Sequence, residues 1–234
     1  MIRAAPARRT AESGALHHRR VVLYGGGRTV DASAVQPGAF FREPRQFELL
    51  ATSVLPELAR TRRRRVRLWS AGCGAGEEAW SLAMIVEEAE LPPALEVEIV
   101  ATDADRDALS RAGEAVYRDD QLRRVNAERR RRHFVRGVGP RHGLWRVVAP
   151  LRDRVELGAL DLAERWPATA PFDAVFCHAP IAQLDPRRAY LLVVRLTEMI
   201  APGGALFLGR APASADDIPG LVACAPSVYR KRTR

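Results

Sequence analysis

The stretch LWSAGCGAGEEAWSLAMIVEE at residues 68–88 decides the fold that this sequence predicts. An apolar run ends here in three closely spaced glycines, Gly72, Gly74 and Gly76, and a helical pattern follows them at once. Glycine adopts positive φ without strain and lets a ligand approach the backbone closely. The amide groups at the start of the next helix point at the same place. We therefore predict a ligand-binding turn between a buried strand and a helix.

The residues on either side of this stretch continue an alternation of strands and helices. The predicted strands are 65–71, 96–103, two short runs within 143–160, 172–177, 204–209 and 227–232. The predicted helices are 44–60, 77–90, 105–116, 123–135 and 185–204, the last ending on a glycine stop. Such spacing is typical of crossover units. It predicts an α/β fold, a mostly parallel sheet with helices on both faces.

The composition limits the class of protein. A chain of 234 residues with 47% hydrophobic residues suits one domain, and no apolar run is long enough to span a membrane. The first forty residues lack the apolar centre of a secretory signal, so we expect a cytoplasmic protein without membrane insertion. Cys73, Cys177 and Cys224 show no CxxC spacing, and we expect neither a metal site nor a disulfide framework. We assign residues 1–36 to an N-terminal extension without a firm structural prediction and residues 37–234 to the domain.

Arginine dominates a formal net charge of +9 and clusters at residues 60–65 and 128–134. Such clusters attract nucleic acid, an anionic membrane or an acidic protein. They are equally compatible with a solvated helix face. Nucleic acid is disfavoured, because only 6% of the residues are aromatic and base stacking needs such side chains.

The acids after the glycines indicate the kind of ligand. A dinucleotide fingerprint needs a glycine at the sixth position counted from Gly72, where this chain has Glu77. A carboxylate there repels a pyrophosphate, so the turn favours a ligand without phosphates, such as S-adenosylmethionine. Glu77 or Glu78 would then pair with its ammonium group, and Asp103 would accept from its ribose hydroxyls. Alternatively, the two glutamates favour the helix N-terminus electrostatically.

Several further stretches follow in a recognisable order: AFFREPRQFELLATSVLPEL, LWSAGCGAGEEAWSLAM, IVATDAD, RRHF, VELGALDL, FDAVFC, LDPRRAYLLVVRL, APGGALFLG and SVYRK. With them the chain resembles, as a divergent member, the CheR-type methyltransferases, which esterify glutamate side chains of chemotaxis receptors. The resemblance implies a Rossmann-like class I methyltransferase fold with a seven-stranded sheet and S-adenosylmethionine as cofactor. It also implies a small strand-rich insertion near residues 139–154, which helps relatives to dock the receptor.

The resemblance assigns roles position by position. Arg42 matches the arginine of the active site, Glu77 a cofactor-contacting acid with Glu78 as the other candidate, and Asp103 the ribose-binding acid. Asp161 and Leu162 lie where the family has residues beside the adenine. The remaining candidates come from the segment after the predicted strand 172–177: Cys177 and His178 for the cofactor, and Gln183 as a catalytic hydrogen-bond donor.

The chain also departs from the family pattern. After FC, relatives have arginine, asparagine and valine, where this chain has His178, Ala179 and Pro180, and Gln183 replaces a tyrosine. Gln36 and Gly38 replace an asparagine and a threonine, and the N-terminal helical domain of relatives is expected to be missing or shortened. Ala179 and Gln183 leave open whether turnover is retained.

Three functions therefore stand side by side at this point. The first is in-line methyl transfer to a glutamate carboxylate of a receptor-like protein, with possible docking of an acidic surface on the basic helix at 123–134. The second is a catalytically weak S-adenosylmethionine-binding signalling module. The third is methyl transfer to RNA or a small molecule. The sequence has no NPPY-like motif after residue 177, which argues against this third function.

Overall fold

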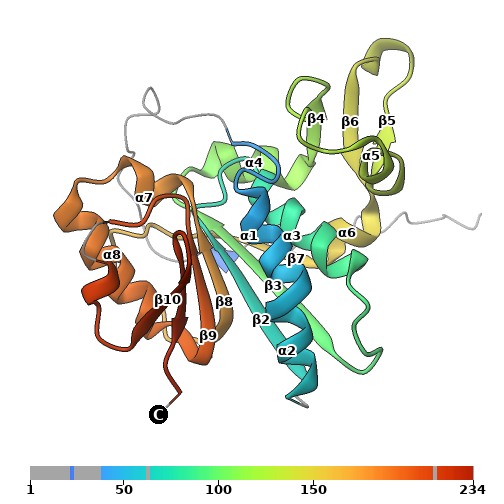
Figure 1. Cartoon of the computed structure of the whole chain (residues 1–234). Coiled ribbons are helices and arrows are strands. Elements are labelled where there is room, and N and C mark those ends of the chain that lie inside the picture. Colours follow the sequence, from blue (N-terminus) through green and yellow to red (C-terminus); the bar gives the residue numbers. More distant parts are fainter. Residues whose placement is uncertain (1–21, 24–37, 62–63, 213–214, 234) are drawn as a thin grey trace, which may run out of the picture.

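The computed structural model describes residues 22–23, 38–61, 64–212 and 215–233. Its main sheet has eight strands in the order β1-β7-β3-β2-β8-β9-β11-β10 (Figure 1). In that order they are Val22–Leu23, Val155–Ala159, Glu96–Asp103, Arg65–Ala71, Phe172–Cys177, Ile200–Leu208, Val228–Lys231 and Leu221–Ala225. Pairing is parallel from β1 to β9 and antiparallel for β11 and β10. The predicted seven-stranded, mostly parallel sheet is confirmed, and β1 adds an eighth strand beside β7.

Helices cover both faces of the main sheet, and each face has its own apolar cluster. The first face carries α1 (Pro44–Leu49), η2 (Leu50–Val54), α2 (Leu55–Arg60), α3 (Glu77–Glu88), α4 (Arg106–Glu114) and α6 (Ala149–Asp153). The second face carries α7 (Ala179–Gln183) and α8 (Pro186–Glu198). Two short 3₁₀ helices, η3 (Gly139–Arg141) and η4 (Ala215–Asp217), lie in connecting segments.

The predicted helix at 44–60 forms as one continuous helix with a wider turn in its middle. The turn is the π-helical segment η2, in which the Leu55 N–H donates to the Leu50 carbonyl. Pro56 follows directly and has no N–H to donate, which removes one ordinary helical bond at this point. The wider turn therefore keeps Leu50, Val54 and Leu55 on the buried face.

A second, smaller sheet corrects the predicted extent of the insertion. Its three antiparallel strands have the order β4 (Val116–Arg118), β6 (Leu144–Val147) and β5 (Phe134–Arg136), with α5 (Ala127–His133) before β5. It stands apart from the main sheet at the upper right of Figure 1. The insertion thus begins well before residue 139, and residues 149–153 form α6 against α3 instead. The apolar pattern missed β4 and β5 because exposed three-residue strands leave almost no periodicity.

Other predicted boundaries also shift. The last long helix ends at Glu198, short of the predicted end at residue 204. Gly203 and Gly204 do not stop this helix, because they lie inside β9. Neither α6, α7 nor β10 was predicted. The expected N-terminal extension, residues 1–36, lies outside the described residues apart from β1, and so do Gln36 and the first arginines of the chain.

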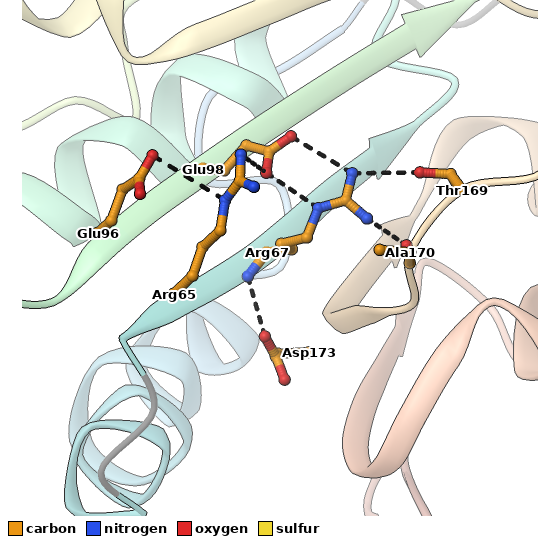
Figure 2. Close-up of polar contacts among 7 residues, drawn as sticks. All are labelled: Arg65, Arg67, Glu96, Glu98, Thr169, Ala170 and Asp173. Atoms are coloured by element: carbon orange, nitrogen blue, oxygen red, sulfur yellow. Dashed lines mark hydrogen bonds and ion pairs between the residues drawn. The ribbon is translucent and has the colours of Figure 1, made fainter.

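Charged side chains link the first residues of β2 and β3 (Figure 2). Arg67 Nε donates to Glu98 Oε2 at 2.9 Å, and Arg65 Nη2 lies 2.8 Å from the same oxygen. Arg67 also donates to Thr169 Oγ1 at 3.3 Å and to the Ala170 carbonyl. These bonds attach the connection between β7 and β8, residues 160–171, to the sheet without a crossover helix.

Among the described residues, no helix is both long and apolar enough to cross a membrane. In the same part of the chain, no three His, Cys, Asp or Glu side chains gather as a metal site would need.

Candidate active site

The glycine turn closes over the carboxyl end of β3. Gly72, Gly74 and Gly76 have φ of 80°, 55° and 97°, as the sequence predicts for a turn that only glycine adopts easily. The N–H groups of Gly72 and Cys73 both donate to the Thr102 carbonyl, at 2.7 and 2.9 Å. A Cβ on Gly74 would meet no atom within 4 Å, so this residue borders open space.

Asp103 is held at the centre of this edge. Its Oδ2 accepts from the Gly74 N–H at 2.7 Å and its Oδ1 accepts from the Asp105 N–H at 2.9 Å. Burial raises the pKa of the Asp103 carboxyl, although these backbone donors oppose the shift. A carboxylate has about four acceptor positions, so each oxygen retains one for a ligand hydroxyl.

Glu77 begins α3 with an unsatisfied carboxylate. The side chain is only 3% exposed, and its Oε2 has no hydrogen-bond partner within the described structure. Burial raises the pKa of Glu77, and the charges of Arg111 and Arg42 partly oppose this. A Cβ on Gly38 would lie 2.3 Å from Oε2, so the segment before the phenylalanine pair passes directly over this acid. A buried acceptor without a donor is the feature that a bound cation would satisfy.

Glu78, the alternative acid, is already engaged. Its Oε1 accepts from Ser70 Oγ at 2.6 Å, and its Oε2 lies 2.8 Å from His178 Nδ1. The other ring nitrogen of His178 lies 2.9 Å from Gln46 Oε1, and both side chains are buried. The geometry thus separates the two candidates: Glu77 has a vacant acceptor, whereas Glu78 and His178 bind each other.

Arg42 follows a strained residue. Phe41 adopts a left-handed φ of 49°, which a bulky residue rarely adopts. Its N–H donates to Ser81 Oγ at 3.0 Å, and the Arg129 guanidinium lies 4.4 Å from its ring centroid. These contacts hold a backbone turn that leaves Arg42 half-buried and close enough to Glu77 to lower the pKa of that carboxyl.

The adenine-side candidates lie beside Asp103. The Leu160 N–H donates to the Asp103 carbonyl at 3.0 Å, which brings the exit of β7 next to the exit of β3. Asp161 Oδ1 accepts from the Ala163 N–H at 2.8 Å, and Arg195 Nη1 donates to the Leu162 carbonyl at 2.7 Å. Both candidate residues are half-buried on this anchored turn.

Two candidates lie apart from the glycine turn. Cys177, the last residue of β8, is fully buried in the apolar cluster under α8, and burial raises the pKa of its thiol. Gln183 is exposed at the end of α7. The start of α7 does reach the turn, because Pro180 Cγ would lie 2.0 Å from a Cβ on Gly72.

Sequence reasoning missed several residues that shape this site. Tyr117 Oη donates to the Ala75 carbonyl in the glycine turn at 2.7 Å, although it comes from the small sheet. Gln46 and Ser70 complete the surroundings of His178 and Glu78. Gln46 could have been identified as a polar residue on a helix face that is otherwise apolar, because Phe47 and Leu50 share that face.

The fold and this edge of the sheet define a class I S-adenosylmethionine-dependent methyltransferase domain. The strand order from β7 to β10 and the acid at the end of β3 are its features. The family model of the CheR methyltransferase S-adenosylmethionine-binding domain matches residues 36–219. The chain belongs to this family.

Named relatives agree with that membership. Chemotaxis protein methyltransferase 1 of Pseudomonas aeruginosa is 35% identical over 214 residues, covering 87% of this chain and 76% of that protein. The chemotaxis protein methyltransferases of Klebsiella aerogenes and Escherichia coli are each 34% identical, covering 77% and 73% of this chain. The chain spans only 61% and 58% of the length of these last two proteins.

Proposed function

We propose that this chain binds S-adenosylmethionine at the glycine turn and transfers its methyl group to a glutamate carboxylate of a receptor-like protein. The vacant Oε2 of the buried Glu77 carries the proposal. A bound cation would satisfy this oxygen, and a phosphate would be repelled by the ionised carboxylate. The amino acid end of S-adenosylmethionine supplies an ammonium group, and the family membership supplies the cofactor.

The remaining parts of the site fit the same ligand. Asp103 retains acceptor positions for two ribose hydroxyls, and Gly74 leaves room for close approach. Asp161 and Leu162 border the same edge and would contact the adenine, with the Asp161 carboxylate accepting from its amino group. When bound, the cofactor would supply a methyl group activated on a sulfonium.

The protein's own task is to position the acceptor. A glutamate with an ordinary pKa of about 4.3 is ionised near neutral pH, so no general base is required. The protein must desolvate this carboxylate, align it behind the methyl carbon and exclude water. The planar fork of Arg42 matches a carboxylate, and the strained Phe41 turn fixes where that fork begins. The exposed Gln183 would approach only an acceptor that covers α7.

The acceptor is a protein with an acidic surface in this proposal. The arginines of α5 divide into two sets. Arg129 pairs with Glu88, and Arg130 donates to the Val125 carbonyl, so these two serve the fold. Arg131 and Arg132 remain exposed, and Arg132 lines a pocket of about 270 Å³. The exposed pair is the part of the basic helix that would meet the acidic partner.

The reaction belongs in the cytoplasm under this proposal. Cys73 and Cys177 are buried free thiols, and burial raises the pKa of both. Free thiols are usual in a reducing compartment. The receptor tail that would be modified therefore lies on the same side of the membrane.

The test is formation of a base-labile methyl ester. Extract from the source cells is incubated with methyl-labelled S-adenosylmethionine and the chain, and volatile methanol is collected after alkaline treatment. We expect labelled methanol with the wild type, strong loss with Arg42→Ala and little rescue by Arg42→Lys. Arg45→Ala, at an exposed arginine in the helix α1 that follows Arg42, is the matched control.

The outcomes separate the alternatives. Label that survives alkali would indicate an N-methylated or RNA acceptor and refute ester formation. Cofactor binding without any transfer would support the signalling module instead. Equal methanol release by the wild type and Arg42→Ala would remove Arg42 from the mechanism.

A further inference from the structure

One buried chain of hydrogen bonds joins the ends of five elements. It runs from Ser70 on β2 through Glu78 on α3 and His178 after β8 to Gln46 on α1, and ends at the Leu208 carbonyl of β9. The Gln46 Nε2–H donates to that carbonyl at 2.9 Å. His178 is 3% exposed and occupies the middle of the chain.

Counting donors fixes the protonation of His178. A backbone carbonyl only accepts, so the amide NH₂ of Gln46 must face Leu208 and its oxygen must face the ring. On the other side, the ionised Glu78 carboxylate also only accepts. Each ring nitrogen therefore faces an acceptor, at 2.8 and 2.9 Å, and needs its own hydrogen.

We propose that His178 is a positioning residue of the cofactor site and is held there as a doubly protonated imidazolium. It fixes the Glu78 carboxylate and, through it, the first turn of α3 that carries Glu77. It also leads into Pro180, which packs directly on Gly72 of the glycine turn. The inference rests on the proposed function, because the position of Glu77 matters only if a cation binds there.

One negatively charged group contacts the His178 ring among the described residues. Phe47 and Phe176 present their rings at 6.2 and 5.7 Å between centroids, with interplanar angles of 77° and 78°. Burial raises the pKa of the adjacent Cys177 thiol, which keeps that group neutral. Among the described residues, Glu78 is thus the ionised group in contact with His178.

Loss of the ring proton would break this arrangement. A neutral ring keeps one N–H, so one nitrogen would direct its lone pair at an acceptor. The bond to Glu78 or to Gln46 would then fail, and the first turn of α3 would lose its support. Cofactor affinity should therefore be full only while both ring nitrogens of His178 carry a hydrogen.

The experiment combines a spectroscopic signal with a binding profile. The ring nitrogens of His178 are followed by nitrogen-15 NMR in the full chain, and S-adenosylmethionine affinity is measured by calorimetry from roughly pH 5 to 8. We expect both nitrogens to be protonated when the cofactor binds, and the affinity to be at least about tenfold lower at any pH at which one of them has lost its hydrogen. His178→Gln should bind weakly at every pH.

Two further variants keep the test decisive. His133→Gln removes another buried histidine that contacts a glutamate, Glu88, at the opposite end of α3, and should leave the profile unchanged. Gln46→Leu keeps His178 but removes the acceptor that faces its Nε2, so one ring hydrogen loses its partner and cofactor affinity should fall. This second variant remains informative if His178→Gln does not fold.

The results that overturn the proposal differ from those that overturn the proposed function. A ring with one unprotonated nitrogen at the acid end refutes the imidazolium, whatever the affinity. A flat affinity profile shared by the wild type and His178→Gln refutes the positioning role. Failure to bind S-adenosylmethionine at any pH, with both ring nitrogens protonated, refutes the proposed function and the positioning role that rests on it.

Discussion

At the scale of single residues, the site depends on two acids that the sequence presents as equals. Glu77 and Glu78 are neighbours, and either could pair with an ammonium group. The structure gives them different surroundings, because Ser70 and His178 engage Glu78 while Glu77 Oε2 is left without a donor. No local pattern could distinguish them, since the Gln46 that orients His178 lies 132 positions away in the chain.

Ionised Glu77 should lower the stability of the ligand-free fold and strengthen cofactor binding. Because burial raises its pKa, ionised Glu77 costs stability above its ordinary titration range, and the cost disappears as the carboxyl protonates at lower pH. We expect Glu77→Gln to raise the unfolding temperature of the ligand-free chain at neutral pH and to weaken S-adenosylmethionine binding about tenfold.

Thermal unfolding and calorimetry measure the two effects on Glu77→Gln. The exposed Glu90, two residues beyond the end of the same helix, provides the control Glu90→Gln. A variant that unfolds at lower temperature yet binds normally would show that Glu77 only stabilises the helix N-terminus.

Two glycines with nearly the same φ allow the cost of backbone strain to be separated from the effect on binding. Gly74 and Gly139 have φ of 55° and 57°, and an added Cβ meets nothing within 4 Å at either position. Alanine at each should therefore cost a similar amount, about 1 kcal/mol, in chemical unfolding. Only Gly74→Ala should lose cofactor affinity, because only Gly74 borders the proposed ligand. Equal affinities of the two variants would contradict that placement.

At the scale of elements, α3 links the cofactor edge to the small sheet. Its first turn carries Glu77 and Glu78, and its last residue, Glu88, bonds to Arg129 and His133 of α5. Tyr117 of β4 returns to the glycine turn through the Ala75 carbonyl. The small sheet and α5 therefore contact the main domain both at the end of α3 and at the glycine turn.

The Glu88 contact should make stability depend on pH. Burial alone would raise its pKa, but hydrogen bonds from His133 and Arg129 outweigh it and lower the value from 4.5 to about 2. Its stabilisation is present above about pH 4.5 and is lost as pH falls towards 2. We expect Glu88→Gln to cost about 1 to 2 kcal/mol at neutral pH after solvent screening, and less as pH falls.

Urea unfolding of the wild type and Glu88→Gln at several pH values measures this difference. The exposed Glu114 at the end of α4 gives the control Glu114→Gln. A stability difference that stays constant from neutral pH to about pH 3 would contradict the assigned ion pair.

At the scale of the whole molecule, buried elements were predictable and peripheral ones were not. The strands β2, β3 and β8 were predicted to the residue, because each contains a short apolar stretch that ends at a clear loop or turn signal. The short helix α7 and the strand β10 were not predicted, because five residues with mixed exposure show no clear hydrophobic period. The places of the candidate site residues at strand ends, such as Asp103, follow from the same predicted strands.

The whole site also depends on contacts that sequence spacing does not reveal. The connection at residues 160–171 holds Asp161 and Leu162 beside Asp103 without a crossover helix. It does so because Arg67 and Arg195 bind its carbonyl groups, as Figure 2 shows for Arg67. Arg67 near the start of β2 and Arg195 in α8 are both polar residues that a sequence pattern assigns to solvent, so these two contacts became visible only in the fold.

Calorimetric titration of the full chain with S-adenosylmethionine, beside a parallel titration with NAD, tests the central claim most directly. We predict one cofactor bound per chain, with affinity reduced in Gly74→Ala and retained in Gly139→Ala, and no binding of the dinucleotide. Binding of NAD, or no heat of binding with S-adenosylmethionine, would contradict the account of a phosphate-free adenosyl ligand at this turn.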